Sequence, residues 1–156
     1  MTTKAAVNDF IAQKNIAVVG VSRGGKKFGN IAFKELKQKG YRVFPIHSHA
    51  DTLEGEKCYP SLSALPEKMD GVLTKVTSVI VVPPAQTEQV VRDAHAVGIP
   101  RVWMQQGAES DAAIAFCREH GMSVVSGECI LMFCEPARFY HRAHRWVKGV
   151  AGQLPR

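Results

Sequence analysis

The sequence predicts a single α/β domain built on a doubly wound, mainly parallel sheet. Short apolar runs alternate with amphipathic stretches about five times along the 156 residues, which is typical of parallel strands joined by helical crossovers. The run "SVIVVPP" (78–84) is unbroken and β-branched, as expected of a strand buried on both faces. The length suits about one domain, and no repeat or linker divides it.

The first strand is expected at 15–21, "NIAVVGV". A helix at 29–40 should follow, because Ile31, Phe33 and Leu36 recur near one face and a glycine ends the pattern. The same alternation predicts strand 41–47, a short helix with a serine N-cap at 61–70, strand 78–84, helix 85–97, strand 101–106, helix 109–120, strand 123–127 and a last helix at about 136–150. The single domain of residues 1–156 therefore has a core over about 12–131 and a C-terminal helical extension over 132–156.

Composition and charge narrow the classes of function. The chain is 46% apolar, and neither its first residues nor its longest apolar run suits a signal peptide or a membrane span, so we expect a cytoplasmic protein with no membrane partner. The formal charge of +6 indicates an anionic partner. Seven lysines and arginines fall between Arg23 and Arg42, with Glu35 the only acid among them. The four cysteines are expected to be free thiols.

In a doubly wound sheet, ligands bind at the edge where the carboxyl ends of the parallel strands meet. The segment "GVSRGGKKFGN" (20–30) lies at this edge, between the first strand and the first crossover helix. His47 and the segments "VPP" (82–84), "QQGAES" (105–110) and "GEC" (127–129) end the other strands there. These stretches form the candidate site.

The segment 20–30 departs from both common phosphate motifs. It is one residue away from a P-loop, because Lys27 stands where a hydroxyl should hold magnesium, so a nucleoside triphosphatase is disfavoured. As a dinucleotide fingerprint it has Ser22 in place of the second glycine. The second strand ends at His47 without the acid that holds an unmodified ribose, which disfavours NAD. NADP and coenzyme A both carry an extra phosphate on the ribose and stay open.

Anion binding is nevertheless the preferred interpretation of this segment over a solvated turn. Glycines at a helix N-terminus leave backbone N–H groups free to point at an anion. Arg23, Lys26 and Lys27 add three cations within five residues. A purely structural turn needs no such concentration of positive charge.

Several segments, in order, resemble one family. They are "IAVVGVSRGGKKFGN", "LKQKGYRVFPI", "LEGEKCYPSLSALPEKMDGV", "VVPP", "GIPRVWMQQGAES" and "HGMSVVSGECI", which together span about residues 16–131. The chain resembles the stand-alone CoA-binding proteins, a Rossmann-like group similar to the N-terminal CoA-binding domain of the succinyl-CoA synthetase α subunit. His47 and Ser48 replace the usual Asn-Pro pair of that family, and 73–78 resembles an insertion.

The resemblance implies a cleft that holds coenzyme A or an acyl-CoA. The implied contacts are Gly20, Val21, Ser22, Arg23, Lys26, Lys27, Gly29 and Asn30 around the phosphates, His47 at the adenosine end, and Pro83, Pro84, Gln105, Gly107 and Cys129 along the pantetheine arm. Succinyl-CoA synthetase places its phosphorylated histidine in a second domain, for which this chain has no room. Binding without catalytic residues, as a sensor or regulatory module, is therefore expected, and an NADP-dependent oxidoreductase using the same cleft is the alternative.

A group of cysteines and histidines and a basic segment near the C-terminus are two other candidates for function. Cys129, Cys134, His141 and His144 are close in sequence, but their spacings depart from those of zinc sites, so no metal is predicted. The basic segment 136–150 carries aromatic residues at helical spacing, which favours packing against the domain or in a homodimer over nucleic-acid binding. A third hypothesis is an interaction protein in which this segment is the working part and the cleft is vestigial.

Overall fold

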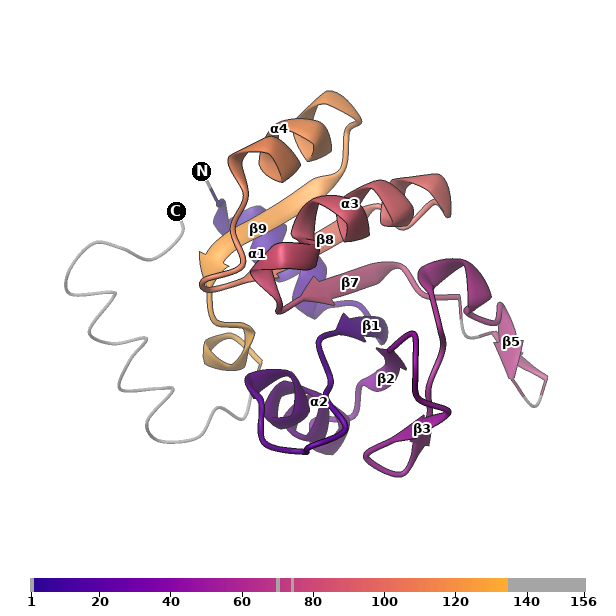
Figure 1. Ribbon diagram of the computed structural model, residues 1–156. Helices are drawn as coiled ribbons and strands as arrows, with labels where there is room; N and C mark the ends of the chain where they lie inside the picture. The colour runs from indigo at the N-terminus through magenta and orange to yellow at the C-terminus, as the bar shows by residue number, and fades with distance from the viewer. Residues whose placement is uncertain (1, 70, 74, 135–156) are drawn as a thin grey trace.

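The computed structural model describes residues 2–69, 71–73 and 75–134 (Figure 1). Its centre is a five-stranded sheet in the order β2-β1-β7-β8-β9, and every pairing is parallel. The strands are β1 (Asn15–Val19), β2 (Arg42–Ile46), β7 (Ser78–Val81), β8 (Arg101–Gln105) and β9 (Ser123–Glu128). The predicted strands are thus confirmed, whereas the helix predicted at about 136–150 falls outside the described residues.

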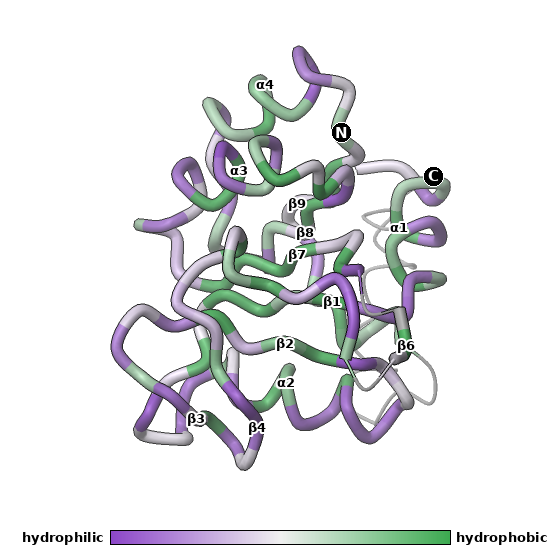
Figure 2. The backbone as a smooth tube through the Cα atoms, turned by 90° about the vertical axis from the view of Figure 1, so that its right-hand side faces the viewer, coloured by the Kyte–Doolittle hydropathy of each residue, from purple (hydrophilic) through white to green (hydrophobic). Residues whose placement is uncertain are grey.

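Helices cover both faces of the sheet. Figure 1 shows α3 (Thr87–Ala96) and α4 (Asp111–Glu119) on one side and α1 (Lys4–Ile11) and α2 (Phe28–Gln38) on the other. β1 divides its side chains between two core clusters, because successive residues of a strand point to opposite faces. The apolar tube segments gather along the strands in Figure 2. The doubly wound, Rossmann-like α/β fold is therefore confirmed.

Helix α1 was missed by the sequence analysis. Thr3 caps it by accepting a hydrogen bond from the N–H of Ala6 at 3.1 Å. Only two of its side chains, Val7 and Phe10, are buried, so its apolar periodicity is too short to read. The ring of Phe10 meets that of Trp103 edge-on with 5.3 Å between centroids, which anchors the helix to β8.

The prediction of a helix at 61–70 is wrong. A single 3-10 turn, η1 (Leu62–Ala64), occupies that stretch and is followed by a small hairpin of β5 (Lys68–Met69) and β6 (Val72–Leu73). Leu65 is extended because it precedes Pro66, whose ring disfavours the helical region for the residue before it. A second hairpin, β3 (Thr52–Leu53) with β4 (Glu56–Lys57), precedes the turn.

The buried face of α2 also differs from the expectation. Ile31 is 43% exposed, whereas Ala32, Phe33 and Leu36 are buried together with Gly29. The helix is thus rotated so that its first glycine, rather than its first isoleucine, faces the sheet. The reason lies in the loop before it, described below.

Two further 3-10 turns follow strands of the sheet: η2 (Pro84–Gln86) lies between β7 and α3, and η3 (Ile130–Met132) follows β9. All four cysteines, Cys58, Cys117, Cys129 and Cys134, are buried free thiols. None of the helices in the described part of the chain has the length and apolarity needed to span a bilayer.

Candidate functional site

The loop of residues 20–27 connects β1 to α2 through two close backbone approaches. A Cβ atom on Gly20 would lie 2.8 Å from both Val82 Cβ and Pro83 Cδ, and the φ of +117° also favours glycine. A Cβ on Gly29 would lie 2.2 Å from the carbonyl oxygen of Gly20. The two glycines therefore let the start of α2 and the end of β7 meet at the carboxyl end of β1.

The side chain of Asn30 holds this loop by hydrogen bonds to Ser22. Its side chain is fully buried, and its Oδ1 accepts hydrogen bonds from the backbone N–H and the hydroxyl of Ser22 at 3.1 and 2.9 Å. Its Nδ2 donates to the carbonyl of Ser22 at 2.8 Å and to Glu54 Oε1 at 2.7 Å. All four hydrogen bonds serve the loop and its support, so the Asn30 amide acts as a brace.

Glu54 is a part of the site that the sequence analysis did not single out. It lies between β3 and β4 with a φ of 52°, and its carboxylate accepts from Asn30 and forms an ion pair with Lys34 at 2.9 Å. Hydrogen bonds from Lys34 and Asn30 hold the pKa of this carboxyl below its usual range. The only local signal was the Glu-Gly pair of "LEGEK", which is typical of a turn.

The outer surface of the loop is positively charged. Arg23, Lys26 and Lys27 are exposed, and none of them forms an ion pair with any residue that the structure describes. Lys27 is the N-cap of α2 but makes no capping hydrogen bond with its side chain. The N–H groups of Phe28 and Gly29 consequently have no acceptor in the described part of the chain. N–H groups without an acceptor and exposed cations are the elements from which anion sites at helix N-termini are generally built.

A cleft of about 390 Å³ opens beside this loop, at the carboxyl ends of β1 and β2. Of the residues that the resemblance implies as CoA contacts, Gly20, Val21 and His47 line this cleft. The remaining lining residues come from the same strand ends, from the segment that leads into η1, from the last residue of η2 and from α3: Val19, Ile46, Ser48, Pro60, Ser61, Leu62, Gln86, Gln89, Val90 and Asp93. The ring Nδ1 of His47 accepts a hydrogen bond from the backbone N–H of His49 at 3.0 Å, which orients the imidazole at the cleft rim.

The proline pair after β7 lies next to the loop. Pro83 contacts the Gly20 position described above, and Pro84 begins η2 and is exposed. The fully buried Thr87 donates its hydroxyl hydrogen to the carbonyl of Ala108 at 2.7 Å, which joins the connection after β7 to the connection after β8. Thr87 was another residue that sequence reasoning did not single out.

The residues that the resemblance implies for the far side of the site lie outside the cleft described above. Gln105 is buried, and its Oε1 accepts from the N–H of Ile130 at 3.2 Å, so its amide oxygen supports η3. Cys129 is buried at the N-cap of the same turn. The N–H of Gly107 donates to both carboxylate oxygens of Glu109, at 3.0 and 2.9 Å. None of these three implied residues lines the cleft.

The metal-ligand grouping weighed above is only partly visible. Within the described ranges, no group of three or more histidine, cysteine, aspartate or glutamate side chains is placed to hold a metal ion. Cys129 and Cys134 are buried thiols, and His141 and His144 lie outside the described residues.

Comparison with known proteins decides the family. A family model described as a CoA binding domain matches residues 14–135. The chain belongs to the CoA binding domain family. The match covers the sheet, Gly20, Gly29 and the Glu54 turn, so the candidate site described above lies within the matched region.

Three relatives place the domain in context. It is 26% identical over 132 residues to the α subunit of the ADP-forming acetate–CoA ligase II of Pyrococcus furiosus, covering 78% of this chain but only 28% of that subunit. It is 26% identical to the uncharacterized protein YneT of Bacillus subtilis, covering 82% and 91% of the two chains. A solved structure of a conserved hypothetical protein from Pyrococcus furiosus is 36% identical with a TM-score of 0.67, covering 76% and 97%.

These relatives are of two kinds. The chain spans about a quarter of the length of the ligase subunit, whereas it spans most of the two short proteins. Neither the family model nor these relatives support the alternative of an NADP-dependent oxidoreductase.

Proposed function

We propose that this protein binds coenzyme A or an acyl-CoA without catalysing a reaction on it. The observation that carries the proposal is the braced 20–27 loop above an α2 N-terminus whose first N–H groups have no acceptor among the described residues. The family match points to CoA as the anion. CoA carries a pyrophosphate and a ribose phosphate, which suits several donors and cations in one place.

The residues have distinct parts in this proposal. The N–H groups at the start of α2 and the cations Arg23, Lys26 and Lys27 would hold phosphate oxygens. Asn30 would keep the loop in its binding shape before the ligand arrives, which reduces the ordering cost of binding. The cleft of about 390 Å³ has the size of a site for part of a small-molecule ligand, and His47 at its rim replaces the usual family residue.

The absence of catalysis and a sensor or regulatory role are part of the proposal. The chain covers 28% of the ligase subunit, so most of that subunit has no counterpart in the aligned region. The relatives of similar length, by contrast, are covered almost entirely. A domain with this braced loop and this cleft would be suited to reporting CoA or acyl-CoA levels to a partner.

Isothermal titration with CoA, 3′-dephospho-CoA, NADP and NAD tests the proposal. We expect CoA to bind most tightly, with weaker binding once the 3′-phosphate is removed. The Lys26→Ala, Lys27→Ala double variant should bind CoA about tenfold more weakly, because two exposed charge-assisted contacts are lost. The Lys4→Ala, Lys68→Ala variant removes the same charge outside the loop and should bind like the wild type. A preference for NADP, or no binding of CoA, would contradict the proposal.

A further inference from the structure

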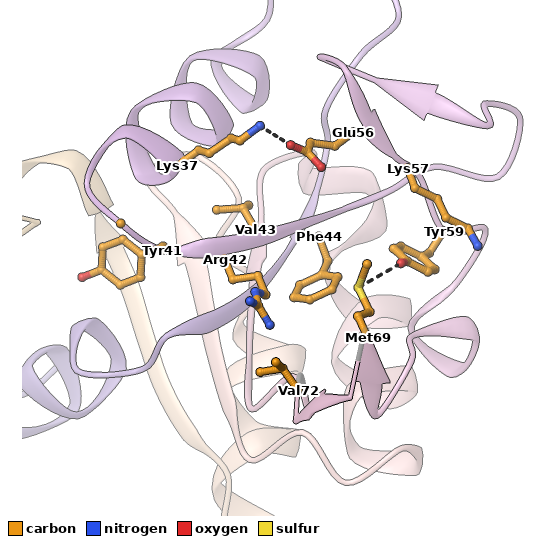
Figure 3. Close-up of a pocket in the computed structure, with 11 residues that line it drawn as sticks. Lys37, Tyr41, Arg42, Val43, Phe44, Glu56, Lys57, Tyr59, Met69 and Val72 are labelled. Carbon is orange, nitrogen blue, oxygen red and sulfur yellow. Dashed lines mark hydrogen bonds and ion pairs between the residues drawn. The ribbon is translucent and has the colours of Figure 1, made fainter.

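A second and larger pocket lies on the outer side of β2, away from the carboxyl edge of the sheet (Figure 3). Its volume is about 600 Å³, and it shares no lining residue with the cleft beside the 20–27 loop. Its walls come from the end of α2, from the first half of β2 and from both small hairpins. The size is typical of a small-molecule site.

The floor of this pocket is apolar and partly aromatic. The rings of Phe44 and Tyr59 lie side by side with 6.0 Å between centroids. The Tyr59 hydroxyl contacts the sulfur of Met69 at 3.8 Å. Met69 is 39% exposed and Val72 is 53% exposed, so the wall formed by β5 and β6 leaves apolar surface in contact with water. An apolar group entering here would bury that surface.

The rim of the pocket carries cations in excess of acids. Glu56 is paired with Lys37, as the dashed line in Figure 3 shows. Arg42 is exposed, projects beside Phe44 in the same view, and forms no ion pair with any described residue. The ammonium of Lys57 lies 5.5 Å from the centroid of the Tyr59 ring and likewise has no acid partner in the described part of the chain. Two positive charges therefore border an apolar floor.

The occupant is not another strand. β2 is the edge of the sheet, but Pro45 has no N–H to donate, and its carbonyl already accepts from the N–H of Tyr59 at 3.0 Å. The next N–H along the edge, that of His47, donates to the carbonyl of Tyr59 at 2.9 Å. The edge is thus closed over half of its length, and the open space beside it suits a compact ligand.

We propose that this pocket is a second ligand site, which takes an organic anion with an apolar body, such as an aryl or short acyl carboxylate. The apolar body would lie on Phe44 and Tyr59 and against Val72, and the anionic group would face one of the two cations that border this floor, Arg42 or Lys57. The proposal is independent of CoA binding, because the two sites have different walls.

The test uses 8-anilinonaphthalene-1-sulfonate, a fluorescent aromatic anion, as the probe. We expect it to be displaced by 4-phenylbutyrate at least about fivefold more readily than by the neutral 4-phenylbutanol, since only the carboxylate meets the cations. The Arg42→Gln, Lys57→Gln variant should bind the probe about fivefold more weakly and lose this preference. The Lys4→Gln, Arg118→Gln variant, with two cations removed from the exposed surfaces of α1 and α4, is the matched control and should bind like the wild type.

Two further measurements make the test specific. Val72→Asp places a negative charge on the exposed wall and should weaken probe binding without unfolding the protein, as circular dichroism would check. Excess CoA should not displace the probe. Equal displacement by the acid and the alcohol, unchanged binding by the double variant, or displacement by CoA would each overturn the proposal. A dimer in sedimentation velocity that Val72→Asp dissociates would also overturn it, because a second copy would then fill the pocket.

Discussion

Replacing Asn30 by alanine tests whether the side-chain amide that braces the 20–27 loop contributes to stability and to CoA binding. The substitution removes four hydrogen bonds, three to Ser22 and one to Glu54, from a side chain that is fully buried. At a net contribution of about 0.5–1 kcal/mol each, the free energy of unfolding should fall by about 2–4 kcal/mol. For a domain of this size the loss corresponds to a melting temperature lower by roughly 6–12 °C.

The same substitution should weaken CoA binding by at least about tenfold, because an unbraced 20–27 loop must be ordered when the ligand binds. Urea denaturation measures the first effect and calorimetric titration, at a temperature where the variant is folded, measures the second. Asn8→Ala on the exposed side of α1 is the matched control and should change neither quantity. An unchanged melting temperature would refute the role of the brace, and a destabilised variant with full CoA affinity would refute its coupling to the proposed phosphate site.

Three further changes test the structure. Gly29→Ala places a Cβ 2.2 Å from a backbone carbonyl and should lower the free energy of unfolding by about 1–3 kcal/mol in urea, whereas Gly24→Ala, with open space around it, should be nearly neutral; equal losses would contradict the close approach. Glu54→Gln should lower the free energy of unfolding at pH 7, because the hydrogen bond from Lys34 stabilises the ionised carboxyl of the wild type. The difference in free energy between variant and wild type should shrink as the pH falls through the lowered pKa of this carboxyl, and a difference that does not vary with pH would contradict this. Burial raises the pKa of the Cys117 thiol to about 11, so iodoacetamide at pH 8 should modify it much more slowly in the folded protein than in urea, as mass spectrometry would show; equal rates would contradict its burial.

The order of the sheet elements was predictable because each leaves a local mark. Apolar runs such as 15–21 and 78–84 are continuous since both faces of a central parallel strand are covered. The helix at 61–70 was predicted wrongly because the serine that could cap it was considered without the effect of Pro66 on the residue before it. Helix α1 was missed because two buried side chains in eight residues make no readable period.

The candidate site was only partly predictable, because some of its residues are close together in the chain and others meet only in the folded protein. The glycines and cations of the 20–27 loop are close together in the chain, so the sequence alone was enough to propose an anion-binding segment there. The part played by Glu54 depends on a hairpin that returns to the loop across 24 residues, and no local pattern reports that distance. The pocket beside β2 likewise draws its walls from α2, β2 and the two small hairpins, which are separate in the chain.

By itself, the sequence determined the class of fold, the edge of the sheet at which ligands would bind, and the charge of the loop there. Backbone periodicity and the conformational freedom of glycine are local properties, which explains why they can be read residue by residue. Only the tertiary structure decided that Asn30 points inward as a brace, that Ile31 faces water and that Gln105 is turned toward η3. These choices depend on which distant groups pack together, because a buried amide must find its partners wherever the fold provides them.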